Sequence, residues 1–351
     1  MFKGKRGHRG VIKLTMLSSA EKVKGQGVAS AYRELVNLLE ERYINEIDMK
    51  INSFEKSDIT HYHTVDFRFF LSTFFKKKRG VRVGYVHFLP ETMEGSLKLP
   101  WIARVVFYKY LIGFYKRMDE IVVVNPSFIP KLTAYDIPEE KIHYIPNFVS
   151  KKSFFPLPEA EKQLARKKYG IPADKFTVIG IGQVQHRKGV LDFIEVAKQL
   201  PDVQFVWAGG FSFGKITSGY EELKKIYDNP PSNVKFIGIV DRSEMNACIN
   251  MADVFFMPSY NELFPMAILE AMSSDVPILL RNLDLYEEIL DGYYVKEVDN
   301  PGFIRAIERL ENDADYYQEM LQAAKRGAAY YSEDRLAQIW LDFYQGLLTK
   351  E

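Results

Sequence analysis

The sequence predicts an α/β protein built from two doubly wound domains, each with a parallel sheet covered by helices on both faces. Three observations lead to this prediction. The chain has 351 residues, more than a single hydrophobic core of roughly 250 to 300 residues usually serves. Short runs rich in Val and Ile alternate with helical patterns along the chain. The alternation is interrupted near the middle and then starts again, which indicates a second sheet.

Ten strands are expected from these apolar runs. In the first half they fall at residues 11–17, 59–63, 81–87, 120–124 and 141–145. In the second half they fall at residues 176–181, 203–208, 234–237, 254–257 and 277–280. A last, aromatic-rich helix is expected over 332–348.

Prolines and lysines interrupt both periodicities in residues 147–158, NFVSKKSFFPLP. We therefore predict an N-terminal domain over 1–147, a C-terminal domain over 148–331, and a terminal segment over 332–351 whose helix packs back on the first domain. Open α/β sheets bind ligands outside the carboxyl ends of their strands, so the active site is expected in a cleft between the two domains.

The net charge of +1 hides an asymmetry between the two halves. Residues 1–147 hold 24 Lys and Arg against 16 Asp and Glu, a balance of +8, and the remainder holds 23 against 30, a balance of −7. A basic half favours contact with an anionic surface. The basic N-terminus lacks the apolar core of a signal peptide, and no apolar run reaches the roughly 18 residues that a membrane span needs. A cytoplasmic or membrane-peripheral protein is expected.

The single cysteine, Cys248, excludes an intrachain disulfide and lies in a predicted helix over 245–251, where a buried structural thiol is expected.

The strand at 254–257 leads into a loop and then into a helix opened by Pro265, and both Pro265 and the preceding Phe264 are candidates for donor binding. Free amides at such a helix start make a site for phosphate. Glu262 precedes the helix and Glu270 lies about a turn and a half inside it, where a carboxylate suits the paired hydroxyls of a ribose. On spacing alone, both glutamates could instead be solvated surface residues.

The segment ADVFFMPSYNELFPMAILEAMSSDVPILL resembles the nucleotide-binding signature of the retaining family 4 glycosyltransferases, which have the GT-B fold of two facing Rossmann-like domains. The resemblance implies that Glu270 binds the ribose of the donor and that Glu262 contacts the transferred sugar. It also covers IPNFVSKKSFFP, in which Phe148 replaces the family's customary glycine.

A second segment, GQVQHRKGV, follows the strand at 176–181 and resembles the family's paired "GR" and "KG". Lys188 matches that pattern, whereas Gln183 stands where the family has arginine, so we expect Arg187 to supply the missing charge against the leaving diphosphate. On residue type alone, Arg187 and Lys188 could be a solvated loop.

In the first half, Gly25 and Gly27 open a helix. In the family this loop approaches the donor, and glycines there permit close approach of the backbone. The alternative is that the two glycines only form a turn. By the same resemblance His87 is the expected catalytic histidine, His63 is second choice, and Glu91 would orient an acceptor hydroxyl. A metal site is not expected: the histidines lack a ligand cluster, and Asp313 and Asp315 form a D-x-D in a helix.

Residues 74–82 and 101–117 mix aromatic with basic side chains. In the second segment Trp101, Arg104 and Lys109 are candidates for contact with an acceptor or a membrane, and Val105, Tyr108, Ile112 and Tyr115 continue the stripe that begins at Trp101. The helix would either pack on its own sheet or lie on an anionic leaflet. Nucleic acid is not expected, because no recognition motif is present.

The fragments KVKGQGVASAYREL, YVHFLPETMEGSLK and FYKRMDEIVVVNPSFI narrow the resemblance to Gram-positive enzymes that add a second hexose to glucosyl-diacylglycerol. The product of those enzymes is the disaccharide lipid that anchors lipoteichoic acid. This resemblance implies that the donor is UDP-glucose or UDP-galactose, that the acceptor is a glycolipid, and that no cofactor or metal is required. It also implies that the enzyme lies at the inner face of the cell membrane. The alternatives are a soluble or polymeric acceptor, such as a teichoic acid or polysaccharide precursor, and an inactive partner subunit.

Overall fold

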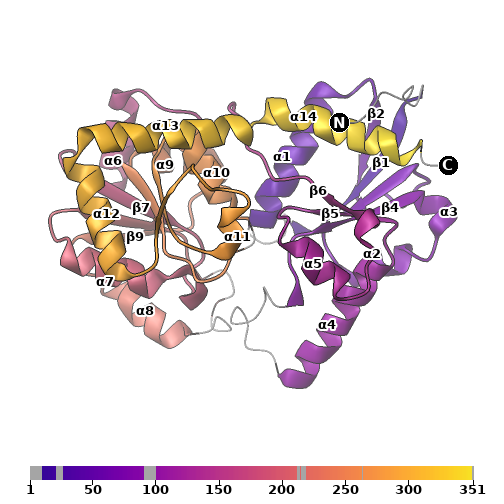
Figure 1. Ribbon diagram of the computed structural model, residues 1–351, viewed down its shortest axis with the longest axis horizontal. Helices are drawn as coiled ribbons and strands as arrows, with labels where there is room; N and C mark the ends of the chain where they lie inside the picture. Colours follow the sequence, from indigo (N-terminus) through magenta and orange to yellow (C-terminus); the bar gives the residue numbers. More distant parts are fainter. Residues whose placement is uncertain are drawn as a thin grey trace. The chain divides into compact units, whose positions relative to one another are not determined.

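The computed structural model describes residues 10–20, 27–90, 100–211, 214, 219–262 and 264–349. The chain divides into two compact units (Figure 1). Unit 1 comprises residues 1–91, 99–148 and 333–351, and unit 2 comprises residues 92–98 and 149–332. The division after Phe148 lies one residue beyond the predicted boundary.

Unit 1 is a six-stranded parallel sheet in the order β2-β1-β3-β4-β5-β6. Its strands are β1 (Ile12–Leu17), β2 (Ile47–Ile51), β3 (Ile59–Tyr62), β4 (Val81–Val86), β5 (Glu120–Val123) and β6 (Ile142–Tyr144). Its helices are α1 (Gly27–Arg42), α2 (Phe67–Ser72), α3 (Lys76–Arg79), α4 (Trp101–Lys116), α5 (Phe128–Thr133) and α14 (Glu333–Leu347).

Unit 2 repeats this plan with a sheet in the order β12-β11-β10-β7-β8-β9. Its strands are β7 (Thr177–Ile181), β8 (Gln204–Ala208), β9 (Val234–Gly238), β10 (Val254–Met257), β11 (Ile278–Arg281) and β12 (Val295–Glu297). Its helices are α6 (Glu159–Tyr169), α7 (Val190–Gln199), α8 (Tyr220–Asp228), α9 (Arg242–Asn250), α10 (Met266–Ser273), α11 (Asp284–Glu287), α12 (Asn300–Asn312) and α13 (Ala314–Tyr330).

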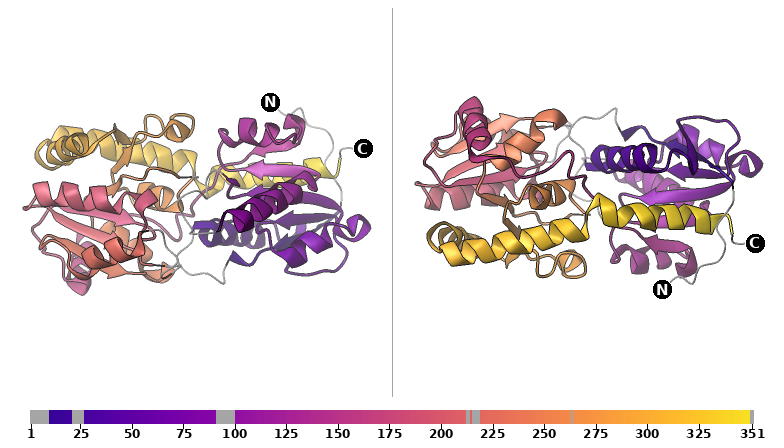
Figure 2. Two further views of the ribbon diagram at one scale, coloured as in Figure 1. Left: turned by 90° about the horizontal axis from the view of Figure 1, so that it is seen from below. Right: turned by 90° about the horizontal axis from the view of Figure 1, so that it is seen from above.

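Helices lie on both faces of each sheet (Figure 2). Strands covered on both sides are buried throughout, which explains why β5, β7 and β10 are buried at every position and consist mainly of apolar residues. All ten predicted strands are present. The two that the sequence did not predict, β2 and β12, are edge strands with exposed positions, and short polar edge strands lack the apolar run on which prediction relied.

The terminal helix α14 belongs to unit 1, where it packs against α1. Arg42 of α1 donates to the carboxylate of Glu333 at 2.7 Å. Tyr344 lies within hydrogen-bonding distance of His61, at 2.9 Å between Oη and Nδ1, and its ring stacks with that of Trp340. The last helix thus completes the core around β3.

Helix α4 differs from the predicted stripe. Only its last turns are buried, through Leu111, Phe114 and Tyr115, whereas the stripe residues Trp101 and Val105 are exposed. The helix therefore packs on its sheet at its carboxyl end and leaves large apolar side chains in solvent at its amino end.

Cys248 is fully buried in α9, and burial raises the pKa of its thiol to about 12, as expected for a structural residue.

Candidate active site

The strand order of unit 2 reverses between β7 and β10. The first strand of this sheet, β7, continues to β8 on one side and borders β10 on the other. Ligands of doubly wound folds bind outside the carboxyl ends of strands at such a switch point. The loops that follow β7 and β10 carry Lys188 and Glu262, so the topology alone places both predicted residues at the binding edge.

Glu262 and Lys188 form a buried ion pair at this edge. Lys188 Nζ lies 2.5 Å from Oε1 of Glu262, and the two residues are 8% and 5% exposed. Ser259 Oγ donates to the same carboxylate oxygen at 2.7 Å. Arg187 Nη1 lies 3.7 Å from the other oxygen, Oε2. The interpretation of these residues as solvated surface groups is therefore wrong.

The loop after β7 is shaped to hold these cations close to the loop after β10. The short 3₁₀ helix η4 (His186–Lys188) ends at Gly189, whose φ of +70° favours glycine and where a Cβ would lie 2.2 Å from the carbonyl oxygen of Pro258. Tyr260 N donates to the carbonyl of Arg187 at 2.8 Å. Backbone contact between the two loops thus fixes the side chains that meet at Glu262.

Arg187 is held by two further groups. Its Nη1 donates to the carbonyl of Asn261 at 3.1 Å, and its Nε donates to Oε1 of Gln185 at 3.1 Å. Gln185 in turn donates to Oε1 of Gln183 at 2.7 Å. Gln183, which stands at the family's arginine position, is therefore linked to Arg187 through Gln185, a residue that the sequence analysis did not single out.

Burial opposes both charges of the central pair. It raises the pKa of Glu262, but the charges of Lys188 and Arg187 and the hydrogen bonds outweigh it and hold that pKa below its ordinary value. Burial lowers the pKa of Lys188, and Arg187 adds to that effect while Glu262 opposes it. Glu262 is consequently ionised at neutral pH and neutralises a cationic site.

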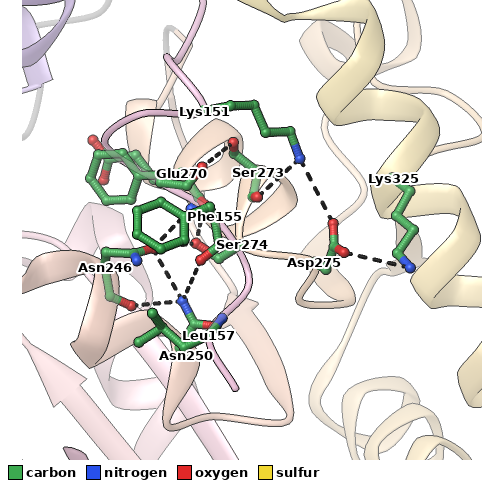
Figure 3. Close-up of polar contacts among 11 residues, drawn as sticks. Lys151, Phe155, Leu157, Asn246, Asn250, Glu270, Ser273, Ser274, Asp275 and Lys325 are labelled. Carbon is green, nitrogen blue, oxygen red and sulfur yellow. Dashed lines mark hydrogen bonds and ion pairs between the residues drawn. The ribbon is translucent and has the colours of Figure 1, made fainter. Parts of the chain in front are cut away.

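Glu270 lies on α10, where Figure 3 shows it beside Ser273 and Ser274. It is 4% exposed, and its Oε1 accepts from Nη1 of Arg242 at 2.7 Å. Pro265 occupies the N-cap of α10 rather than the predicted first helical position. Phe264 is buried with its ring 5.3 Å from that of Tyr331.

Arg242 and Ser259 are functional candidates that the sequence analysis missed. Arg242 is the first residue of α9, where a cation faces the positive end of the helix dipole. That unfavourable position is the signal that could have indicated a buried anionic partner.

His87 and His63 follow β4 and β3 in unit 1, and both are buried. Their ring centroids lie 6.0 Å apart, and the His61 ring lies 4.2 Å from that of His63. Among the described residues, no hydrogen-bond partner exists for either ring nitrogen of His63 or for Nε2 of His87. Burial lowers the pKa of His61 and of His87 to about 3, and that of His63 well below its ordinary value.

The remaining candidate residues of the first half lie on α1, on α4 or outside the described residues. Gly27 begins α1, whereas Gly25 and Glu91 lie outside the described residues. Trp101, Arg104 and Lys109 are exposed on α4.

Both acidic residues of the D-x-D lie at the start of α13. Asp313 caps α13 by accepting from Tyr316 N at 3.0 Å, and Asp315 lies in the first turn. Within the described part of the chain, no three His, Cys, Asp or Glu side chains are grouped to hold a metal ion.

Two cations lie around one buried carboxylate at the switch point of unit 2, where doubly wound folds bind ligands. Comparisons with known proteins identify the class of enzyme to which this site belongs. Residues 27–152 match the family described as Glycosyltransferase Family 4, and residues 161–327 match Glycosyl transferases group 1. The chain is 49% identical over 334 residues to alpha-galactosylglucosyldiacylglycerol synthase of Streptococcus pneumoniae, covering 95% of this chain and 89% of that protein. The protein belongs to the family 4 glycosyltransferases, which confirms the predicted family and enzyme class.

More distant relatives and solved structures extend the similarity. The processive diacylglycerol alpha-glucosyltransferase of Acholeplasma laidlawii is 28% identical over 67% of this chain and 70% of its own length. Sucrose-phosphate synthase from Thermosynechococcus elongatus matches with a TM-score of 0.76 at 15% identity, over 97% of this chain and 100% of that one. Anabaena HepE in complex with UDP and glucose matches with a TM-score of 0.72 at 16% identity, over 95% and 99%. The predicted GT-B fold is confirmed.

Proposed function

We propose that the enzyme transfers glucose or galactose from a UDP-sugar to glucosyl-diacylglycerol, with retention of the anomeric configuration. The pneumococcal relative, whose name contains both the sugar and the lipid, supports this acceptor and favours galactose. The diacylglycerol glucosyltransferase among the relatives supports a lipid acceptor independently.

The observation that carries the donor half is the buried Lys188–Glu262 pair at the switch point of unit 2. Lys188 and Arg187 would bind the diphosphate together with the free amides at the start of α10. A diphosphate that enters the site competes with the Glu262 carboxylate for Lys188. Once Lys188 turns to the phosphate, Glu262 is free to contact the transferred hexose and to support positive charge at its anomeric carbon. Glu270 would accept from the ribose hydroxyls.

In the transfer step the bond between the anomeric carbon and the β-phosphate oxygen breaks, and UDP leaves with the electron pair. The acceptor hydroxyl forms the new bond from the same face, and its proton passes to the departing phosphate. Arg187 and Lys188 stabilise the negative charge that develops on UDP. We propose that these cations serve in place of a metal ion, so that the enzyme needs none.

The lipid half of the proposal rests on an exposed surface of unit 1, which we call the aromatic–basic surface. Trp101 at the start of α4 is 68% exposed, and Phe75 before α3 is 61% exposed. Helices α2 and α4 pack together, with the Phe70 and Tyr110 rings 5.3 Å apart. We use this name for two groups of exposed side chains of unit 1: Phe67, Arg68, Leu71, Phe74, Phe75, Lys76, Lys77 and Lys78 in and after α2, and Trp101, Ile102, Arg104, Val105, Val106 and Lys109 on α4.

Exposed aromatic side chains beside cations suit the interface of an anionic leaflet, where each nearby cation contributes about 1 kcal/mol. In the described residues no helix is both long and apolar enough to cross a bilayer. We therefore propose that the enzyme binds peripherally to the inner face of the membrane through the aromatic–basic surface.

The decisive test is incubation of the purified protein with UDP-glucose or UDP-galactose and each of three acceptors: diacylglycerol, glucosyl-diacylglycerol in anionic vesicles, and a soluble teichoic acid precursor. Formation of a diglycosyl lipid from glucosyl-diacylglycerol supports the proposal, and the productive donor identifies the hexose. Transfer to the soluble acceptor alone overturns the lipid assignment. Absence of transfer and of UDP-sugar hydrolysis overturns the enzymatic one.

A further inference from the structure

We infer that Arg242 is a positioning residue for donor recognition, which holds the Glu270 carboxylate in the orientation that accepts the 2′- and 3′-hydroxyls of the nucleotide ribose. This inference rests on the proposed role of Glu270 and deepens it. Nη1 of Arg242 donates to Oε1 of Glu270 at 2.7 Å, and among the described residues no donor to the other oxygen, Oε2, is found. We assign Oε2 to the ribose hydroxyls.

The position of Arg242 at the start of α9 supports a specific role for its contact with Glu270. Arg242 is the first residue of α9, where the positive end of the helix dipole disfavours a cation. Glu270, almost completely buried, would in turn be costly without a charged partner. The ion pair compensates the buried carboxylate of Glu270 and gives the guanidinium of Arg242 an anionic partner.

Two groups of contacts hold the pair from either side. On one side, the guanidinium carbon of Arg242 lies 4.9 Å from the centroid of the Phe154 ring, and Ser273 Oγ donates to the carbonyl of Phe154 at 2.7 Å. Phe154 lies in the segment that precedes α6. The cation–π contact keeps the guanidinium from rotating into solvent.

On the other side, Asn246, one turn further along α9, joins three chain segments (Figure 3). Its Oδ1 accepts from Phe155 N and Ser274 Oγ, both at 3.1 Å, and Ser274 Oγ also donates to the carbonyl of Glu270 at 2.9 Å. Asn250 continues the network, with Oδ1 accepting from Leu157 N at 2.8 Å. Residues 154–157, α9 and α10 are therefore tied together around the Arg242–Glu270 pair.

A bidentate diol needs a carboxylate with a defined direction, and a freely rotating side chain would lose much of that selectivity. Without Arg242, Glu270 would keep its place on α10 but not its orientation. The loss should then fall on ligands with ribose hydroxyls and spare those without them. A role confined to stabilising the fold would weaken binding of both kinds of ligand alike.

The test compares the Kd of UDP with that of 2′,3′-dideoxy-UDP by titration calorimetry, in wild type, Arg242→Ala, Arg242→Lys and Glu270→Ala. We expect Arg242→Ala to weaken UDP binding about tenfold, as for a lost charged hydrogen bond, and to leave the dideoxy ligand within about twofold. Arg242→Lys should recover most of the difference. Lys168→Ala is the matched control, because it removes the exposed ion pair between Lys168 of α6 and Glu244, which lies on α9 like Arg242. This variant should change the Kd of neither ligand.

Equal losses for both ligands in Arg242→Ala, or no loss for either, would overturn the inference. The Glu270→Ala variant distinguishes failure of the positioning role of Arg242 from failure of the proposed ribose role of Glu270. If that variant still distinguishes UDP from the dideoxy ligand as wild type does, the ribose role of Glu270 is wrong. If Glu270→Ala loses the distinction and Arg242→Ala keeps it, only the positioning role fails. Thermal melts of each variant verify that it is folded.

Discussion

Lys188 Nζ and Glu262 Oε1 lie 2.5 Å apart, and both residues are more than nine-tenths buried. They come from the two loops that meet at the switch point of unit 2. In the proposed mechanism Lys188 binds the diphosphate of the donor, so the diphosphate would displace Glu262 from this cation. Donor binding would then exchange one anionic partner of Lys188 for another.

Replacing Glu262 by Gln should separate binding from catalysis. The amide keeps the size of the side chain but removes the charge that competes with a diphosphate for Lys188. We expect UDP to bind up to about tenfold more tightly and transfer to fall by at least about 100-fold. Calorimetry and a radiolabelled transfer assay measure the two effects. Full transfer activity in this variant would refute the role of Glu262.

Replacing Lys188 by Ala should weaken the binding of the diphosphate and leave the binding of the nucleoside unchanged. A buried charged contact with a diphosphate is worth about 2 to 5 kcal/mol, so the Kd of UDP should rise by at least about 30-fold. Uridine, which carries no phosphate, is the matched ligand and should bind equally to both proteins. An unchanged Kd for UDP would remove Lys188 from the donor site.

Metal removal should leave the enzyme active. Because Arg187 and Lys188 supply the positive charge, we expect prolonged dialysis against EDTA to change the initial rate by less than about twofold. Stimulation by more than about tenfold on adding back Mg²⁺ or Mn²⁺ would show that a metal ion carries part of that charge.

The buried histidines should make unit 1 sensitive to acid. Their pKa values are about 3 for His61 and His87, against an ordinary value of 6.5, so the unfolded chain binds protons that the folded protein does not. Stability is fully present above pH 6.5 and falls as the pH drops through and below that value, by up to about 1.4 kcal/mol per pH unit for each histidine.

Urea unfolding between about pH 7 and about pH 4 tests this dependence. His63→Phe removes one such group, whose pKa burial also lowers, and should reduce the slope of unfolding free energy against pH. Identical slopes for wild type and variant would contradict the assignment.

The aromatic–basic surface should set membrane affinity. Trp101→Ala combined with Phe75→Ala removes two exposed rings, and we expect sedimentation with vesicles rich in anionic lipid to weaken at least about tenfold without loss of UDP binding. Leu164→Ala, at a residue of similar exposure on α6 of unit 2, is the control and should sediment like wild type. Equal vesicle binding in the double variant would place the membrane contact elsewhere.

Sequence patterns predicted those parts of the fold that depend on local chemistry. Strands buried on both faces, such as β7 and β10, are continuous apolar runs and were found with nearly correct bounds. The edge strands β2 and β12 carry exposed polar positions and owe their structure to pairing with a neighbour, which no local pattern reports.

The same limit applies to the site. Lys188 and Glu262 were found because each lies in a recognisable segment, and the topology brings the segments together. Arg242 was missed because its importance arises only where α9 meets α10, through a contact with a residue 28 positions away in the chain. The sequence left the exposure of Trp101 open between two alternatives, because an apolar stripe does not reveal where the packed part of a helix ends.

The position of α14 has a consequence for biosynthesis. Unit 1 contains the beginning of the chain and residues 333–351, whereas residues 149–332 of unit 2 form one continuous stretch. A ribosome that makes this chain completes β1 to β6 first, yet the helix that supplies Trp340 and Tyr344 to their core emerges only after all of unit 2. Until that helix is made, the part of the core around His61 and Tyr85 lacks the two side chains that cover it. Transiently exposed apolar surface of this kind promotes aggregation.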